Sequence, residues 1–137
     1  MHILIIDGQG GKIGKLLIEG VREKLPQAEI TAIGTNSIAT ANMLKAGPDQ
    51  AATGVNPVVV ASRTADVIAG PIGIVIADAL VGEITAEMAV AVGRSKAKKI
   101  LIPLNKCDTV VPGVSPLSMS ELVLQAVDQI EKEAVCE

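Results

Sequence analysis

The sequence predicts an α/β fold in which helices cover both faces of a parallel sheet of about five strands, giving three layers. Strand and helix patterns alternate along the chain, which is typical of βαβ units. The strand patterns are apolar at successive positions, as expected where both faces of a parallel strand are buried. The chain has 137 residues, 49% of them hydrophobic, which is enough for one core. We therefore expect a single domain over residues 1–137.

The first half of the chain alternates strand and helix patterns clearly. Residues 2–7 are an apolar strand, and helically spaced apolar residues then predict a helix that Pro26 ends. Residues 29–34 predict the second strand. Residues 37–45 predict a short Ala-rich helix, which a Gly-Pro pair closes.

The middle of the chain fits more than one structure. Asn56 and Pro57 are typical of an N-cap and a first helical residue, whereas the three valines that follow favour a strand. We favour a helix over residues 57–64, followed by a strand within residues 66–70. Residues 72–77 fit a loop, another strand or the entry to a helix.

The second half returns to clear patterns. Thr85 is placed to cap a helix, residues 99–104 predict a strand, and residues 110–111 predict a short one. The last helix has the strongest signal, because Ser118 and Glu121 form a capping box ahead of one apolar stripe.

Composition excludes several kinds of function. The chain has no Phe, Trp or Tyr and a single His, at position 2, so a Tyr acid, most His-based catalysis and aromatic stacking of a base are excluded. A net charge of −3 argues against nucleic-acid and membrane partners. Two cysteines and no basic leader predict a cytoplasmic protein. No clustered His, Cys or carboxylate spacing indicates a metal site.

A glycine-rich turn joins the first strand to the first helix. Residues 7–14 read Asp-Gly-Gln-Gly-Gly-Lys-Ile-Gly, with the G-x-x-G-x-x-G spacing. Such a turn lets the backbone approach a pyrophosphate at the positive end of the helix, although a tight turn without a ligand has the same spacing. The predicted ligand contacts of this turn are Gly8, Gln9, Gly10, Gly11, Lys12, Ile13 and Gly14.

The position that holds the ribose of NAD falls after the second strand. It carries Thr35 and Asn36, with neither an acidic residue for a 2′-hydroxyl nor an Arg for a 2′-phosphate. The missing acid favours NADP, or a ligand other than a dinucleotide. A cap for the following helix also explains Asn36.

The carboxyl ends of the other strands complete the expected site. Gly70 and Pro71 are placed to wall a nucleotide sugar, and Asn105 offers an amide for a carbonyl or base edge. The candidate catalytic groups are Lys106, Cys107, Asp78 and, in the same loop as Asp78, Glu83.

Asn105 also begins an N-K-x-D sequence of the kind with which GTPases read guanine. The phosphate loop of a GTPase needs Gly where Gln9 stands and Ser or Thr where Leu16 stands. A GTPase is therefore not expected.

Three segments, residues 5–14, 65–75 and 100–107, together resemble a family of small bacterial proteins classed as a domain of unknown function. The resemblance covers nearly the whole chain and implies a stand-alone Rossmann-like domain without indicating an activity. The glycine turn is also similar to that of NAD(P)-binding domains such as dihydrodipicolinate reductases and atypical short-chain reductases. Short-chain reductases usually rely on a Tyr and Lys pair, and dihydrodipicolinate reductases carry a second, catalytic domain, for which this chain has no residues left.

Three functions remain open. The first is a nucleotide-binding module, above all for NAD(P), that acts as a sensor or accessory subunit. The second is a small enzyme that uses Lys106, Cys107 or Asp78 on a phosphorylated or nucleotide substrate. The third is an interaction protein without a ligand, and Ala- and Val-rich helices make a homo-oligomer plausible. A bulky residue at Gly11 should abolish binding but not folding if the first is correct.

Overall fold

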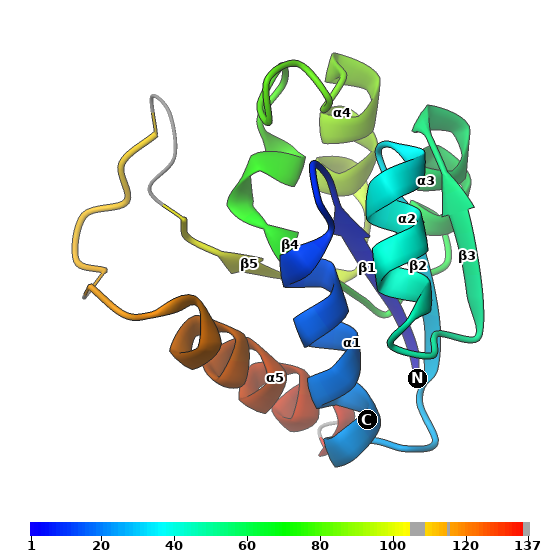
Figure 1. Ribbon diagram of the computed structural model, residues 1–137, viewed down its shortest axis with the longest axis vertical. Helices are drawn as coiled ribbons and strands as arrows, with labels where there is room; N and C mark the ends of the chain where they lie inside the picture. Colours follow the sequence, from blue (N-terminus) through cyan, green and yellow to red (C-terminus); the bar gives the residue numbers. More distant parts are fainter. Residues whose placement is uncertain (105–108, 115, 136–137) are drawn as a thin grey trace.

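The computed structural model describes residues 1–104, 109–114 and 116–135 (Figure 1). The strands are β1 (His2–Asp7), β2 (Glu29–Gly34), β3 (Gln50–Thr53), β4 (Val67–Pro71) and β5 (Lys98–Ile102). The helices are α1 (Lys12–Lys24), α2 (Ser37–Leu44), α3 (Val55–Ser62), the short 3-10 helix η1 (Ile72–Val75), α4 (Ala86–Arg94) and α5 (Met119–Val135). The predicted alternation of strands and helices is confirmed.

All five strands are parallel and lie in the order β3-β2-β1-β4-β5. The chain therefore runs outward from β1 to β3, returns across the sheet, and continues outward on the other side through β4 and β5. In open parallel sheets, the point where the order reverses opens a crevice at the carboxyl ends of the strands. Here that point lies between β1 and β4, and the predicted Rossmann-like α/β fold is confirmed.

Helices cover both faces of the sheet, as predicted. Ile3 and Ile5 of β1 belong to the core that α1, α2 and α5 close. Leu4 and Ile6 belong to the core beneath α3, α4 and η1. This alternation directs the next odd-numbered residue of β1, Asp7, toward the face that carries α1.

The structure differs from the sequence predictions at three places. The edge strand β3 was not predicted, and residues 110–111 are not a strand. The favoured helix in the middle of the chain is confirmed as α3, but it begins earlier than expected. Its N-cap is Gly54, so Asn56 is not the cap and Pro57 lies within the first turn, where its missing N–H costs little. Residues 72–77 begin with the short helix η1.

Candidate functional site

The glycine loop, residues 8–14, turns β1 directly into α1. Gly11 is the N-cap of α1 and has a φ of 73°, a conformation that favours glycine. Its N–H donates to the carbonyl of Gly8 at 2.9 Å. The loop is thus the tight strand-to-helix turn that the spacing of the glycines predicts.

A buried carboxylate holds the shape of this loop. Asp7 is 4% exposed and accepts two backbone bonds, one from Gly8 at 2.8 Å and one from Gly14 at 2.7 Å. Burial raises the pKa of Asp7, and the backbone N–H groups oppose that shift without reversing it. The carboxylate therefore stabilises the turn from inside.

Packing inside the protein explains three of the loop glycines but not the fourth. A Cβ on Gly11 would lie 2.6 Å from the carbonyl oxygen of Ala39 in α2, and one on Gly14 would collide with Met43 of the same helix. A Cβ on Gly8 would lie 2.7 Å from the Thr35 hydroxyl. A Cβ on Gly10 would meet nothing within 4 Å. Gly10 is therefore the loop glycine whose presence the protein's own packing leaves unexplained.

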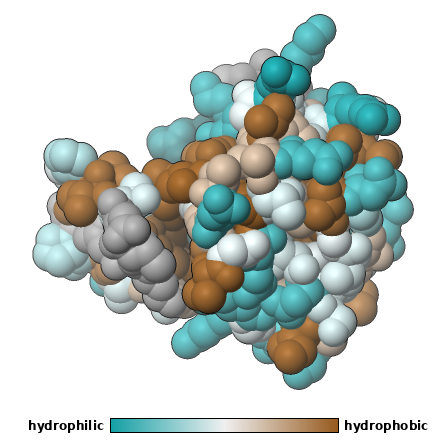
Figure 2. All heavy atoms as spheres, turned by 90° about the horizontal axis from the view of Figure 1, so that it is seen from above, coloured by the Kyte–Doolittle hydropathy of each residue, from teal (hydrophilic) through white to brown (hydrophobic). Residues whose placement is uncertain are grey.

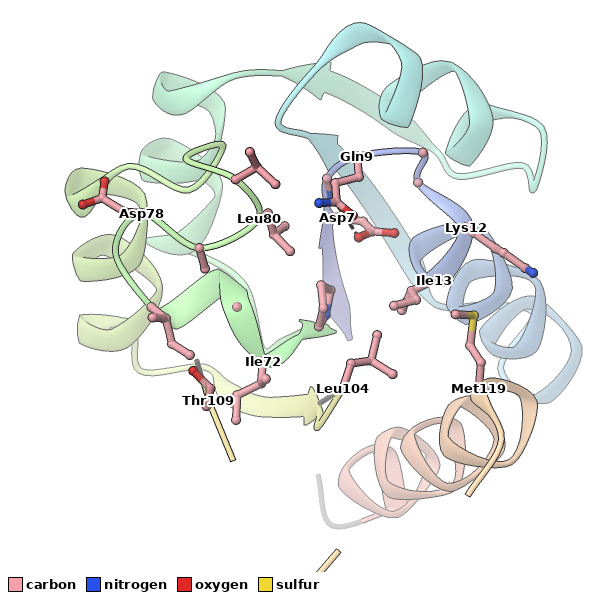
Figure 3. A pocket seen from close by; sticks show the side chains of 18 of the residues that line it. Asp7, Gln9, Lys12, Ile13, Ile72, Asp78, Leu80, Leu104, Thr109 and Met119 are labelled. Atoms are coloured by element: carbon pink, nitrogen blue, oxygen red, sulfur yellow. Dashed lines mark hydrogen bonds between the residues drawn. The ribbon is translucent and has the colours of Figure 1, made fainter. Parts of the chain in front are cut away.

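A cavity of about 530 Å³ opens beside the glycine loop, at the carboxyl ends of β1 and β4 (Figure 3). This volume is typical of small-molecule sites. The lining residues come from the glycine loop, from η1 and the segment after it, from the end of β5 and from the start of α5. They are Asp7 to Ile13, Pro71, Ile72, Gly73, Ile76 to Val81, Leu104, Thr109 and Met119.

The cavity is largely apolar, and the glycine loop forms one side of it. Seen from above, apolar side chains gather between the main body and the segment that follows β5 (Figure 2). Within the described part of the chain, the backbone N–H groups of Gly10 and Lys12 have no acceptor. The Lys12 side chain lies at the rim, with its ammonium directed away from the centre (Figure 3).

The side chain of Glu83 binds the outer side of the glycine loop, away from this cavity. Its Oε1 accepts hydrogen bonds from the Gln9 N–H at 2.9 Å, the Thr35 hydroxyl at 2.5 Å and the Asn36 amide at 2.8 Å. Burial raises the pKa of Glu83, but these three bonds outweigh burial and leave the pKa below its ordinary value. Glu83 is therefore ionised at neutral pH.

The structure places the predicted contacts in two groups. Residues 8–13 and Pro71 line the cavity. Thr35 and Asn36, expected at a ribose, do not line it and bind Glu83 instead. Gly14 and Gly70 are buried behind the site and do not line it either.

Of the candidate catalytic groups, only Asp78 and Glu83 lie in the described part of the chain. Asp78 belongs to the lining, but its exposed carboxylate is directed away from the other labelled groups (Figure 3). Asn105, Lys106 and Cys107 lie outside the described residues.

The sequence did not predict most of the apolar residues that line the cavity, which together form its apolar wall. Ile72, Ile76 and Leu80 follow a strand end, but their spacing does not distinguish a cavity wall from core. Leu104 and Met119 reach the site from separate elements, so only the fold brings them together. Glu83 was expected to be a candidate acid or base in a loop. Nothing in the sequence near Glu83 indicates that its side chain binds the glycine loop.

Two features are absent from the described residues. No helix among them is long and apolar enough to cross a membrane. No group of three or more His, Cys, Asp or Glu side chains in the same residues is arranged to hold a metal ion.

Comparison with known proteins identifies a family. No curated protein matches the chain. A solved structure described as a dodecameric FMN-dependent Ubix-like decarboxylase from Escherichia coli O157:H7 is similar at 19% identity, with a TM-score of 0.49, over 98% of this chain and 77% of that chain. The family model described as "Domain of unknown function (DUF3842)" matches residues 2–135. The chain therefore belongs to the DUF3842 family.

Proposed function

We propose that this protein binds a nucleotide in the cavity between the glycine loop and the ends of β1 and β4. A phosphate group lies against the backbone of Gly10 and Lys12 at the start of α1. The sugar and base extend over the apolar wall. The observation that carries this proposal is the pair of N–H donors, those of Gly10 and Lys12, that have no acceptor among the described residues. They lie beside an apolar cavity at the point where the strand order reverses.

The start of α1 suits an anion for electrostatic reasons. The helix dipole and its unpaired N–H groups attract negative charge there, and α1 has no acidic residue in its first turn. Lys12 is exposed at the rim, and its flexible ammonium can rotate toward a bound phosphate. The buried Asp7 carboxylate is already paired with Gly8 and Gly14, so it shapes the loop and leaves the donors of Gly10 and Lys12 available.

The apolar wall suits the remainder of a nucleotide. Ile13, Ile72 and Leu104 approach the cavity from three different elements (Figure 3). These side chains offer apolar contact area to a flat ring. The chain has no aromatic side chain on which such a ring could stack. NAD(P) is one member of this ligand class. We propose a sensor or accessory role and assign no reaction.

Replacing Gly10 by valine should abolish binding and spare the fold. Its position is open and has no left-handed φ, so we expect the valine to obstruct the phosphate while the midpoint of thermal unfolding stays close to wild type. We expect nucleotide affinity to fall by at least about tenfold, a loss of about 1.4 kcal/mol. Isothermal titration of wild type and variant with FMN, NMN, AMP and NAD⁺ measures the change.

The matched control is Gly93→Val. Gly93 is exposed in α4, has the same open surroundings and does not line the cavity. We expect its affinity to remain within about twofold of wild type, a difference of under about 0.5 kcal/mol. If Gly10→Val folds and binds every nucleotide as wild type does, the phosphate does not lie where we propose.

A further inference from the structure

The strand order suggests where the second half of a dinucleotide would lie. In sheets of this order, the pyrophosphate crosses the glycine loop, and the adenosine half extends over the end of β2, where a polar group binds its ribose. In this protein the end of β2 leads into Thr35 and Asn36. The space above these residues and Gly8 therefore decides whether a whole dinucleotide fits.

Protein atoms already satisfy the donors at this place. One oxygen of Glu83 accepts hydrogen bonds from the N–H of Gln9, the hydroxyl of Thr35 and the side-chain amide of Asn36, all within 3.0 Å. The Asn36 amide also donates to the carbonyl of Gln9 at 3.0 Å. A ribose would have to displace these bonds before it could form its own.

The segment formed by residues 76–84 also fills the space over the first glycine. A Cβ on Gly8 would lie 2.8 Å from Leu80 Cδ1 and 3.0 Å from Glu83 Oε1. A ligand atom at that Cβ position would meet the same two side chains. Leu80 also lines the cavity, whereas Glu83 does not.

Several contacts hold this segment in place. Ile84 is fully buried, and its carbonyl accepts the N–H of Asp78 at 2.7 Å. The N–H of Glu83 donates to the carbonyl of Leu80 at 3.2 Å. Asp78, Leu80 and Val81 all have left-handed φ angles between 57° and 67°. Such angles are costly for residues other than glycine and persist only where surrounding contacts impose them.

Charge disfavours a second phosphate on this outer side. The carboxylates of Asp7 and Glu83 both lie beside the glycine loop and repel each other, and their repulsion contributes to the raised pKa of Asp7. Lys12, by contrast, lies on the cavity side of the loop. An anion is therefore favoured toward Gly10 and Lys12 and opposed near Glu83.

From these contacts we infer that the site takes a mononucleotide and excludes dinucleotides, with Glu83 and Leu80 as the residues that determine this specificity. The inference rests on the proposed nucleotide binding and narrows its ligand class. One phosphate binds at the start of α1, one sugar and ring enter the apolar cavity, and the place of a second nucleoside is filled by residues 76–84.

Paired titrations test the inference on the full chain. The pairs are NMN with NAD⁺ and FMN with FAD, each measured by isothermal titration under one buffer condition. We expect at least one mononucleotide to bind about tenfold or more tightly than its dinucleotide partner. Equal or tighter binding of the dinucleotides would overturn the inference and leave nucleotide binding intact. Failure of all four, and of AMP and GTP, to bind the folded protein would remove the proposed function itself, and the inference with it.

Variants of Glu83 provide an independent test. In Glu83→Ala the donors of Gln9, Thr35 and Asn36 become available, so the affinity ratio of dinucleotide to mononucleotide should rise by at least about fivefold. Glu83→Gln keeps the shape of the side chain and should raise the ratio less. Glu87→Ala removes an exposed carboxylate from the first turn of α4 and should leave the ratio unchanged. If Glu83→Ala folds and its ratio equals that of wild type, Glu83 does not determine the specificity.

Discussion

Alanine at position 11 is expected to destabilise the protein by about 2–4 kcal/mol, which is large for the addition of one methyl group. The left-handed φ of Gly11 costs about 1–2 kcal/mol for any L residue. The new Cβ would also lie 2.6–2.8 Å from the backbone of Ala39, so α1 and α2 would have to separate. Urea unfolding followed by far-UV circular dichroism measures the loss, since the chain has no Trp or Tyr signal.

Gly10→Ala is the control for this prediction. The two glycines are adjacent, but a Cβ on Gly10 meets nothing within 4 Å. We expect its stability to stay within about 0.5 kcal/mol of wild type. A Gly11→Ala protein as stable as Gly10→Ala would show that α2 does not pack against the loop as described. For the same reason a bulky residue at Gly11 cannot separate binding from folding, and Gly10 is the informative position.

Replacing Asp7 by alanine is expected to cost about 2–5 kcal/mol. The variant leaves the buried N–H groups of Gly8 and Gly14 without acceptors, and each unsatisfied group costs about 1–3 kcal/mol. Asp66→Ala is the matched control, because Asp66 also accepts a backbone bond, from His2, but in an exposed setting. We expect the control to lose under about 1 kcal/mol of unfolding free energy. Similar losses in both variants would contradict the structural role of Asp7.

The pH dependence of the stability of an Asp7→Asn variant separates the effect of Asp7 ionisation from the effect of packing. Because burial raises the pKa of Asp7, the folded protein binds this proton more readily than the unfolded chain does. The stabilisation that this proton provides is complete below the pKa of Asp7 in the unfolded chain, about 3.9. It is lost as the pH rises through the pKa of Asp7 in the folded protein. The deficit in unfolding free energy of Asp7→Asn relative to wild type should therefore shrink as the pH rises above about 4. A deficit that grows with pH would contradict the raised pKa.

Local patterns were sufficient to predict most of the fold. The strand β1 has four consecutive apolar residues between His2 and Asp7, and α1 has one apolar stripe that ends before a proline. The capping box of α5 forms as expected, with the Glu121 N–H donating to the Ser118 hydroxyl at 3.2 Å. These elements follow from periodicity and end signals that lie within a few residues of one another.

The missed strand shows where local patterns fail. The strand β3 has only four residues, Gln50–Thr53, and none of them is buried. Its strand geometry comes from pairing with Thr31–Gly34 of β2 rather than from its own sequence. For α3 the valines fit either structure, and packing of Val58 into the core decides for the helix.

The candidate site was predictable only in part, for a similar reason. The glycine loop is a local feature, and its turn forms where the spacing predicts it. The acidic side chain beside the loop comes from Glu83, more than 70 positions away from Gln9. No spacing along the chain indicates such a contact, because the crossing of the chain from β3 back to β4 brings it about.

Calorimetric unfolding of the wild-type protein tests nucleotide binding most directly. Scans are made without ligand and with FMN, NMN, AMP, GTP, NAD⁺ or NADP⁺, on protein shown to be folded and free of co-purified ligand. A nucleotide at one hundred times its Kd should stabilise the protein by about 2.7 kcal/mol, which raises the Tm by several degrees. We expect such a shift with at least one mononucleotide, and its loss in Gly10→Val. An unchanged Tm with every nucleotide would contradict nucleotide binding at the glycine loop.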